Sequence, residues 1–198
     1  ALINDSGEER RRYLNSILSQ LDREYLRRLQ NYNILLSRRN KLLKGDNIAE
    51  ELLWAYSEKM SEDGSYLYEK RRDFVKSISP AVEQYYGQIS GEREQIRIEY
   101  RSDLEETTTD ELFRKNLKRD SLLRYTTSGI HRDDLIFTMN GHPIRRGGSQ
   151  GQQKSFLIAL KLAQFSAIKE QKGGPPILLL DDIFDKLDIL RVESLLKL

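Results

Sequence analysis

The stretch from Glu8 to Lys44 contains neither proline nor glycine, and this constrains the fold more than any other feature. Apolar and tyrosine side chains recur there at intervals of three, four or seven positions. They are Leu14, Leu18, Leu21, Tyr25, Leu29, Tyr32, Leu36 and Leu43. This spacing puts them in one stripe along a helix. We therefore expect one long helix, ended by Gly45 as C-cap, with Asp46 as the N-cap of the next helix.

A second long helical pattern runs from about Ile48 to Tyr86. We expect Gly64 to kink or split this helix, and Pro80 to open a final short helix. Two long helices joined by a tight Gly-Asp turn form an antiparallel hairpin. The sequence thus predicts a helical arm over 8–90, preceded by a connecting segment over 1–7.

The pattern changes after Gly91. Period-two alternation predicts a strand over 95–100, and Asn140-Gly141 predicts a tight hairpin turn after a second strand. The other expected elements are a helix over 110–124, a strand over 135–139, a loop over 145–148, a helix over 149–172, a strand over 177–180 buried on both faces, and a helix from about 189. The expected fold class is α/β (α+β): a long antiparallel helical arm, then a partial head with a mixed sheet over 91–198.

Composition excludes several classes of protein. The 198 residues include no cysteine, which rules out disulfides and cysteine-ligated metals and favours the cytoplasm. No apolar run reaches the roughly 20 residues that cross a bilayer, so we expect no membrane partner. The net charge of +2 is small, but residues 1–44 hold ten Lys or Arg against five Asp or Glu. That excess suits phosphate contacts, although helix faces paired with acids would explain it equally well.

The stretch from Ser149 to Gln153, SQGQQ, opens a helix with polar residues. Ser149 is a suitable N-cap, and a helix N-terminus presents free N–H groups and partial positive charge. Gly151 would let an anion approach the backbone, and the glutamines would add neutral donors. The features are suited to phosphate, but a capped helix that only faces water has the same features.

The run ILLLDD follows, from Ile177 to Asp182. An apolar strand that ends in Asp is where open α/β sheets place ligand chemistry. In P-loop NTPases such an aspartate helps to hold Mg²⁺. A strand followed by a polar turn would look the same.

The order of these motifs carries a resemblance. SQGQQ, then ILLLDD, then Lys186-Leu187-Asp188 resembles the signature, Walker B and D-loop of ATP-binding-cassette heads in the branch with the SMC proteins. Across its whole length the chain is similar to the RecF family of bacterial DNA repair and recombination ATPases. The segment LINDSGEERRRYLN, the residues from Ser37 to Asn40, and Gly129-x-His131-Arg132-Asp133-Asp134-Leu135 support this resemblance. The motifs of the latter third are the specific ones.

Three departures from the family pattern matter. Ile130 replaces the usual Pro after Gly129, and Asp185 stands where the D-loop often begins with Ser. The phosphate-cradling pattern Gly-x-x-x-x-Gly-Lys-Ser/Thr is missing. In the family this P-loop lies upstream of residue 1. We therefore expect the chain to be a fragment that cannot hydrolyse ATP alone, cut from a parent that is a slow DNA-dependent ATPase.

The resemblance implies a role for each motif residue. Asp181 would help to hold Mg²⁺ and Asp182 would be the general base that polarises water. The signature would contact the γ-phosphate of ATP on the partner subunit, and Asp188 would lie in the D-loop at that interface. The signature residues are Ser149, Gln150, Gly151, Gln152 and Gln153. His131 has no assigned role, and a structural hydrogen-bonding histidine is the simplest reading of it.

The resemblance also implies partners. The parent would form an ATP-dependent homodimer, bind double-stranded DNA and single-strand/double-strand junctions, and act with the RecR and RecO mediator proteins at the bacterial nucleoid. The candidate DNA contacts are Arg10, Arg11, Arg12, Arg27, Arg28, Arg38, Arg39, Arg145 and Arg146. Two alternatives stay open: another SMC-like chromosome ATPase head, which would carry a longer coiled coil, and a non-enzymatic helical adaptor, which would not respond to nucleotide.

Overall fold

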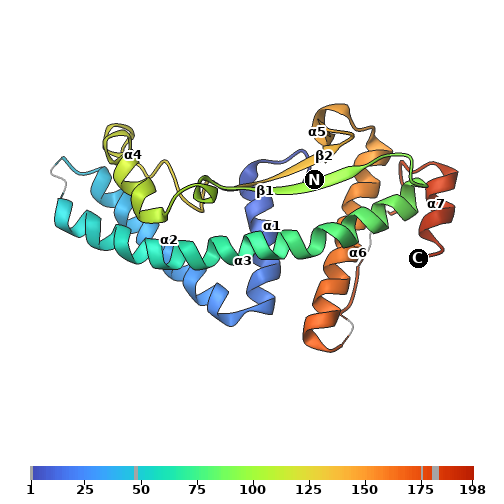
Figure 1. Cartoon of the computed structure of the whole chain (residues 1–198), viewed down its shortest axis with the longest axis horizontal. Helices are drawn as coiled ribbons and strands as arrows, with labels where there is room; N and C mark the ends of the chain where they lie inside the picture. The colour runs from blue at the N-terminus through green and yellow to red at the C-terminus, as the bar shows by residue number, and fades with distance from the viewer. Residues whose placement is uncertain (1, 47–48, 175, 180–182) are drawn as a thin grey trace. The chain divides into compact units, whose positions relative to one another are not determined.

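The structure is a computed structural model that describes residues 2–46, 49–174, 176–179 and 183–198. Figure 1 follows the chain from blue at its N-terminus to red at its C-terminus. Its elements are α1 Gly7–Leu21, α2 Arg23–Leu43, α3 Glu50–Ser90, β1 Ile96–Arg101, the 3-10 turn η1 Asp103–Glu105, α4 Thr109–Leu123, β2 Asp134–Met139, β3 His142–Pro143, α5 Ile144–Gly147, α6 Gln150–Lys172 and α7 Ile189–Leu195.

The chain divides into two compact units. Unit 1 comprises Ala1–Arg10, Phe74–Glu99 and Leu135–Leu198, and unit 2 comprises Arg11–Asp73 and Tyr100–Asp134. The expected division at residues 1–7, 8–90 and 91–198 follows motifs rather than compactness, and it stays a prediction.

Unit 2 begins with two helices where one was expected. Asp22 separates α1 from α2: its backbone is extended, and its side chain accepts hydrogen bonds from the N–H groups of Glu24 and Tyr25. Burial would raise the pKa of Asp22, but hydrogen bonds from Tyr66, the Tyr25 backbone and Lys70 lower it to about 2. An ionised N-cap held on several sides interrupts the helix, so the prediction of one helix from Glu8 to Lys44 is wrong.

Helices α2 and α3 form the predicted antiparallel hairpin. Asp22 lies 3.1 Å from Lys70, Arg28 lies 3.3 Å from Asp63, and Arg39 donates to Ser57 at 3.1 Å. The residue numbers of the partners on α3 decrease as those on α2 increase, as expected for antiparallel helices. The turn differs from expectation, because Lys44 is the C-cap of α2 and α3 begins only at Glu50. Asp46 is therefore not the N-cap of α3.

Helix α3 is continuous, so the expected break at Gly64 and the helix start at Pro80 are both wrong. Gly64 serves close packing instead. A Cβ there would lie 3.3 Å from the Thr109 hydroxyl and 3.4 Å from the Tyr32 ring. Pro80 lies inside the helix, although a proline there has no N–H to donate and its ring crowds the carbonyl four residues earlier.

The three strands form one sheet in the order β1-β2-β3. Strand β1 alternates buried and exposed residues, as predicted. Strands β2 and β3 pair antiparallel with Met139 opposite His142, and the turn residues Asn140 and Gly141 have φ angles of 49° and 80°. This confirms the hairpin predicted from Asn-Gly.

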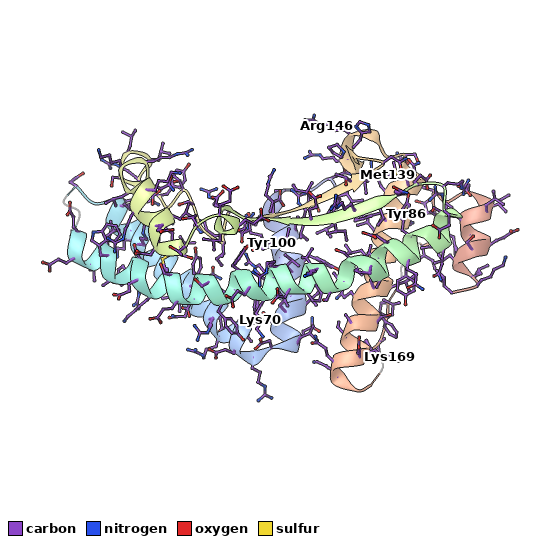
Figure 2. All side chains as sticks on the ribbon, in the orientation of Figure 1. Lys70, Tyr86, Tyr100, Met139, Arg146 and Lys169 are labelled. Atoms are coloured by element: carbon purple, nitrogen blue, oxygen red, sulfur yellow. The ribbon has the colours of Figure 1, made fainter. Side chains whose placement is uncertain are left out.

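In unit 1, helix α6 packs on the sheet and on the end of α3. The Phe156 ring of α6 lies 4.9 Å from the Phe137 ring of β2, and the hydroxyls of Ser166 and Tyr85 are 2.8 Å apart. Tyr86 of α3 also donates to the Met139 sulfur at 3.6 Å, and Figure 2 shows the two residues close together. These contacts hold α6 against β2 and the end of α3.

Two expectations for unit 1 fail. The residues expected as a loop before Ser149 form the short helix α5, which begins directly after Pro143. The expected buried strand over 177–180 is wrong over its described part: residues 177–179 form no strand, and Ile177 and Leu179 are 89% and 86% exposed. No neighbouring strand pairs with them in the described three-stranded sheet, and apolar sequence alone cannot hold a strand without a partner. None of the described helices combines the length and apolar character needed to cross a membrane.

Candidate functional site

Ser149 closes the N-terminus of α6 in a reciprocal capping box. Its hydroxyl accepts from the Gln152 N–H at 3.2 Å, and its own N–H donates to Gln152 Oε1 at 2.7 Å. Ser149 and Gln150 are exposed. A hydroxyl that accepts this hydrogen bond still has its proton to donate. The cap therefore fits an incoming anion, because it offers an O–H donor at the positive end of a long helix.

A polar network connects this cap to the D-loop segment within unit 1. Gln152 Nε2 donates to Glu94 Oε1 at 2.9 Å, and Arg191 Nη2 donates to the same oxygen at 2.8 Å. Arg191 Nε reaches Asp188 Oδ2 at 3.1 Å. Two motifs expected at the same dimer interface are thus connected through one carboxylate and one guanidinium.

Asp188 is the N-cap of α7. It accepts from the backbone N–H of Arg191 at 3.0 Å. That hydrogen bond, together with the positive charges of Arg191 and Arg93, holds the pKa of Asp188 below its usual range against a small effect of burial. Asp188 is therefore ionised at neutral pH and fixed in direction by Arg191, which is itself buried.

Gly151 meets the D-loop segment directly. A Cβ at this position would lie 2.9 Å from the carbonyl oxygen of Lys186, closer than any side chain tolerates. We expected this glycine to give an anion access to the backbone. The structure supplies another reason for it: the approach of the Lys186 backbone to the first turn of α6.

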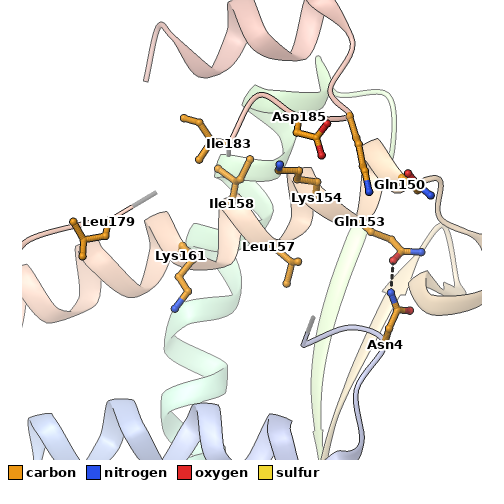
Figure 3. A pocket seen from close by; sticks show the side chains of 11 residues that line it. Asn4, Gln150, Gln153, Lys154, Leu157, Ile158, Lys161, Leu179, Ile183 and Asp185 are labelled. Carbon is orange, nitrogen blue, oxygen red and sulfur yellow. Dashed lines mark hydrogen bonds between the residues drawn. The ribbon is translucent and has the colours of Figure 1, made fainter. Parts of the chain in front are cut away.

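Gln150 and Gln153 line a cavity of about 500 Å³ beside α6 (Figure 3). Gln153 Oε1 accepts from Asn4 Nδ2 at 2.9 Å, and Gln153 Nε2 donates to the Gly148 carbonyl at 2.9 Å. Gln153 therefore joins the Asn4 side chain to the backbone at Gly148. The full lining is Asn4, Gln150, Gln153, Lys154, Leu157, Ile158, Lys161, Leu179, Ile183, Asp185 and Lys186.

Asp181 and Asp182, the expected magnesium ligand and general base, lie outside the described residues. Within the described ranges, no three His, Asp or Glu side chains gather as a protein-only metal site requires. An Mg²⁺ held by one carboxylate and nucleotide phosphates needs no such cluster. Both assignments stay predictions.

His131 is a half-buried hydrogen-bonding residue of unit 2. Its Nδ1 lies 3.1 Å from the Tyr32 hydroxyl, and its Nε2 lies 3.1 Å from the Thr126 carbonyl. Burial lowers its pKa to about 4, so the ring is neutral at physiological pH. Gly129 has a φ of +117°, and a Cβ there would lie 2.7 Å from the Tyr32 hydroxyl. The glycine therefore leaves room for the hydroxyl that pairs with His131.

The adjoining Asp133 belongs to a second buried cluster. Arg71 donates to Asp133 Oδ2 at 3.2 Å and to the Ile130 carbonyl at 2.7 Å, and the Tyr100 hydroxyl also donates to Asp133. Burial raises the pKa of Asp133 against the charge of Arg71. In unit 2, the motif around His131 and Asp133 therefore holds the arm helices to the loop before β2.

Most of the nine candidate DNA-contact arginines have partners within the protein. Arg39 cannot serve as a surface contact, because it is fully buried and pairs with Asp120 at 2.8 Å. Arg27 and Arg28 each lie 2.6 Å from Glu24. A repeat of arginines on a helix gives no sign of which ones turn inward, so the sequence could not separate Arg39 from Arg38.

The other candidate arginines divide into two groups. Arg10 donates to the Asp5 carbonyl at 2.7 Å, and Arg11 donates to the Asp133 carbonyl at 2.8 Å. Arg12, Arg38, Arg145 and Arg146 are exposed. Arg10, Arg145 and Arg146 belong to unit 1, and the other six candidates belong to unit 2.

Sequence reasoning missed Glu94 and Arg191. The spacing Asp188-x-x-Arg191 at a helix start was a usable signal, since residues three apart share a helix face. Glu94 gave no signal, because it stands in the charged run Glu92-Arg93-Glu94 and any of these could have turned inward.

No family model matches the chain. A DNA replication and repair protein RecF from Flavobacterium johnsoniae is 44% identical over 201 residues, which covers 100% of this chain and 56% of the relative. A RecF from Parabacteroides distasonis is 46% identical over 197 residues, 100% of this chain and 54% of the relative.

A solved structure agrees with the curated relatives. It is that of the recombination mediator protein RecF with ATP in the RecFOR pathway, and it superposes with a TM-score of 0.87 at 31% identity. The match covers 99% of this chain and 56% of that one. The chain therefore spans about half the length of the proteins that it matches. Its full-length similarity in sequence and in fold shows that it belongs to the RecF family.

Proposed function

We propose that this chain is the arm and second head segment of an ATP-dependent DNA-binding protein of recombinational repair. The parent binds ATP with Mg²⁺, dimerises on ATP, holds DNA at gaps and helps to load recombinase, with RecO and RecR as partners. Residues 8–90 form its arm, 91–198 form the signature-bearing part of the head, and 1–7 connect to the rest. The fold match to RecF with ATP supports this proposal.

The observation that carries the proposal is the state of the α6 N-terminus. Ser149 is exposed, its hydroxyl keeps a proton to donate, and Gln152 holds its geometry from the other side. Nothing within the described part of unit 1 brings a phosphate-binding loop to this cap. An anion that belongs to a partner subunit would explain why the cap faces outward.

ATP supplies the negative charge that draws the two copies together, and its hydrolysis removes that bridge. In each copy, Ser149 would donate to the γ-phosphate held by the other subunit. Asp188, oriented by Arg191, would face the same interface. Because the arrangement repeats in both copies, the dimer would be two-fold symmetric.

The test is the mass of the full-length protein in solution, measured by light scattering with and without Mg·ATP. We expect a monomer that becomes a dimer only with ATP. Ser149→Arg should abolish the ATP-dependent dimer, because a bulky cation replaces the hydroxyl at the anion position, while ATP binding is kept. A mass that ignores ATP, in a protein that binds it, overturns the proposal.

Two control variants separate the phosphate contact from the helix cap. Gln171→Arg places the same side chain on the exposed last turn of α6 and should leave dimerisation intact. Ser149→Asp keeps a capping oxygen but has no proton to donate to a phosphate, so it should keep the stability of the helix and lose the ATP-dependent dimer. If Ser149→Arg still dimerises as well as Gln171→Arg, the signature assignment is wrong.

A further inference from the structure

The outer surface of α4 and the turn after it is strongly cationic. Residues 112–132 contain six Lys or Arg and one acidic residue, Asp120. The cations form what we call the α4 face: Arg114, Lys115, Lys118, Arg119, Arg124 and Arg132, all exposed. All of them belong to unit 2, and α4 is labelled in Figure 1.

The one acid of this segment is removed from the surface. Asp120 is fully buried, where it pairs with Arg39 at 2.8 Å and accepts from the Thr127 N–H at 2.9 Å. Asn40 accepts from the Thr126 N–H at 2.7 Å, which ties the turn to α2. The α4 face is therefore firmly held, and its charge is not balanced from within the segment.

Ordinary explanations of a basic helix face do not account for it. Cations often gather in the last turn of a helix, but the last turn of α4 has none. Surface cations often pair with nearby acids, and two of the six do so here: Arg114 lies 2.7 Å from Asp110, and Arg124 lies 3.7 Å from Asp46. Among the described residues, Lys115, Lys118 and Arg119 form no ion pair, although like charges at this spacing destabilise a helix.

The same surface exposes apolar and aromatic groups. Leu122 is 83% exposed and Tyr125 is 39% exposed. The Arg132 guanidinium lies 5.2 Å from the centre of the Tyr125 ring, which keeps both side chains on the outside of the turn. Stacking on an aromatic ring needs unpaired bases, so for a duplex the cations of this face are the groups that matter.

We propose that the α4 face binds the phosphate backbone of duplex DNA without reading its sequence. Lysine and arginine contacts to phosphates position a duplex and carry no base information. This inference rests on the proposed function, because it names the surface with which such a protein holds DNA. It also assigns the DNA contact to α4 instead of the arginines of α1 and α2. Most of those arginines have partners within the protein, whereas most cations of α4 have none among the described residues.

The experiment compares full-length proteins by fluorescence anisotropy on a labelled duplex over a series of salt concentrations. The test variant carries Lys115→Gln, Lys118→Gln and Arg119→Gln. Each lost phosphate contact should reduce the slope of log affinity against log salt by about 0.9, and the triple variant by roughly 3. At about 0.1 M salt the affinity should fall by roughly 10- to 100-fold.

The matched control carries Lys59→Gln, Lys76→Gln and Lys169→Gln, which removes the same charge from exposed positions elsewhere. It should bind DNA with nearly the wild-type slope. An equal loss in both variants would mean that only bulk charge matters and would overturn the α4 assignment. Wild-type affinity in the test variant would also overturn it.

Two readouts separate this inference from the proposed function. Both variants should keep their ATP-dependent mass and their melting temperature, because the substituted side chains are exposed. If the wild-type protein fails to bind duplex DNA, the proposed function and this inference both fall. If DNA binding and dimerisation persist in the test variant, only the α4 face is refuted.

Discussion

His131 shows how a residue singled out for function can be explained by packing. Its two ring nitrogens lie 3.1 Å from the Tyr32 hydroxyl and from the Thr126 carbonyl. Burial lowers its pKa, and the charges of Arg132 and Arg11 act in the same direction, while Asp120 opposes them. The fold therefore favours the neutral imidazole.

This predicts a pH dependence of stability. Because the folded pKa of about 4 is below the ordinary 6.5, the unfolded chain binds a proton first as pH falls. The contribution of His131 is complete above pH 6.5 and is lost as pH falls towards 4. Its size is about 2–3 kcal/mol. Urea unfolding of the full-length protein at several pH values measures it.

The control for this prediction is the other histidine. His131→Gln should flatten the stability curve between neutral pH and the mildly acidic range. His142→Gln, at an exposed position, should leave it unchanged. Identical curves for wild type and His131→Gln would show that His131 does not carry the effect.

Individual residues were predictable where their role is local. Ser149 as a cap and Asn140-Gly141 as a turn depend on neighbours a few positions away, and both predictions are confirmed. Asp22 and Arg39 were misjudged because their partners are distant. Arg39 pairs with Asp120, 81 positions along the chain, and Asp22 binds Tyr66, 44 positions along. No local pattern contains that information.

At the scale of elements, α6 and α7 are coupled through Arg191. Its guanidinium donates to Glu94 at 2.8 Å, to the Ser155 hydroxyl at 3.0 Å and to Asp188 at 3.1 Å. Arg191 is 4% exposed. Its loss would leave the largely buried Glu94 carboxylate without its cation.

Arg191→Met should therefore destabilise the full-length protein by roughly 3 kcal/mol, the usual cost of removing one partner of a buried ion pair. Glu94→Gln in the same background should recover part of that loss, because no unpaired charge remains. A double-mutant cycle on urea unfolding measures the coupling. Additive effects of the two substitutions would show that the pair is not energetically linked.

Elements were predictable from sequence when their own pattern determined them. The hairpin of α2 and α3, strand β1, helix α4 and helix α6 follow from periodicity and caps. Residues 177–179 show the limit: isoleucine and leucine favour a strand, but a strand exists only with a partner. The short helix α5 was missed because four residues after a proline carry no periodic signal.

At the scale of the whole molecule, the proposed dimer would make the signature site half of a pair. The cap at Ser149 and the D-loop at Asp188 belong to unit 1, where they share one hydrogen-bonded network. In the proposed dimer each copy offers this network to the nucleotide of the other. Two-fold symmetry would then make one substitution act at both nucleotides.

The aspartates of ILLLDD should control how long that dimer lasts. In the full-length protein, Asp182→Asn keeps the size of the side chain but removes the carboxylate that would polarise the attacking water. We expect hydrolysis to slow by about 100-fold, within the range of general-base catalysis. The dimer should persist after ATP is added, because the γ-phosphate bridge is no longer removed. Phosphate release and mass over time measure both effects.

The matched control is Asp103→Asn, the same change at an exposed aspartate outside the motif segments. It should leave turnover and dimer lifetime close to those of the wild type. Normal turnover in Asp182→Asn would remove Asp182 from the role of base. A third outcome is slow turnover with a dimer that dissociates at the wild-type rate. It would mean that hydrolysis does not open the clamp, and that product release or DNA does so instead.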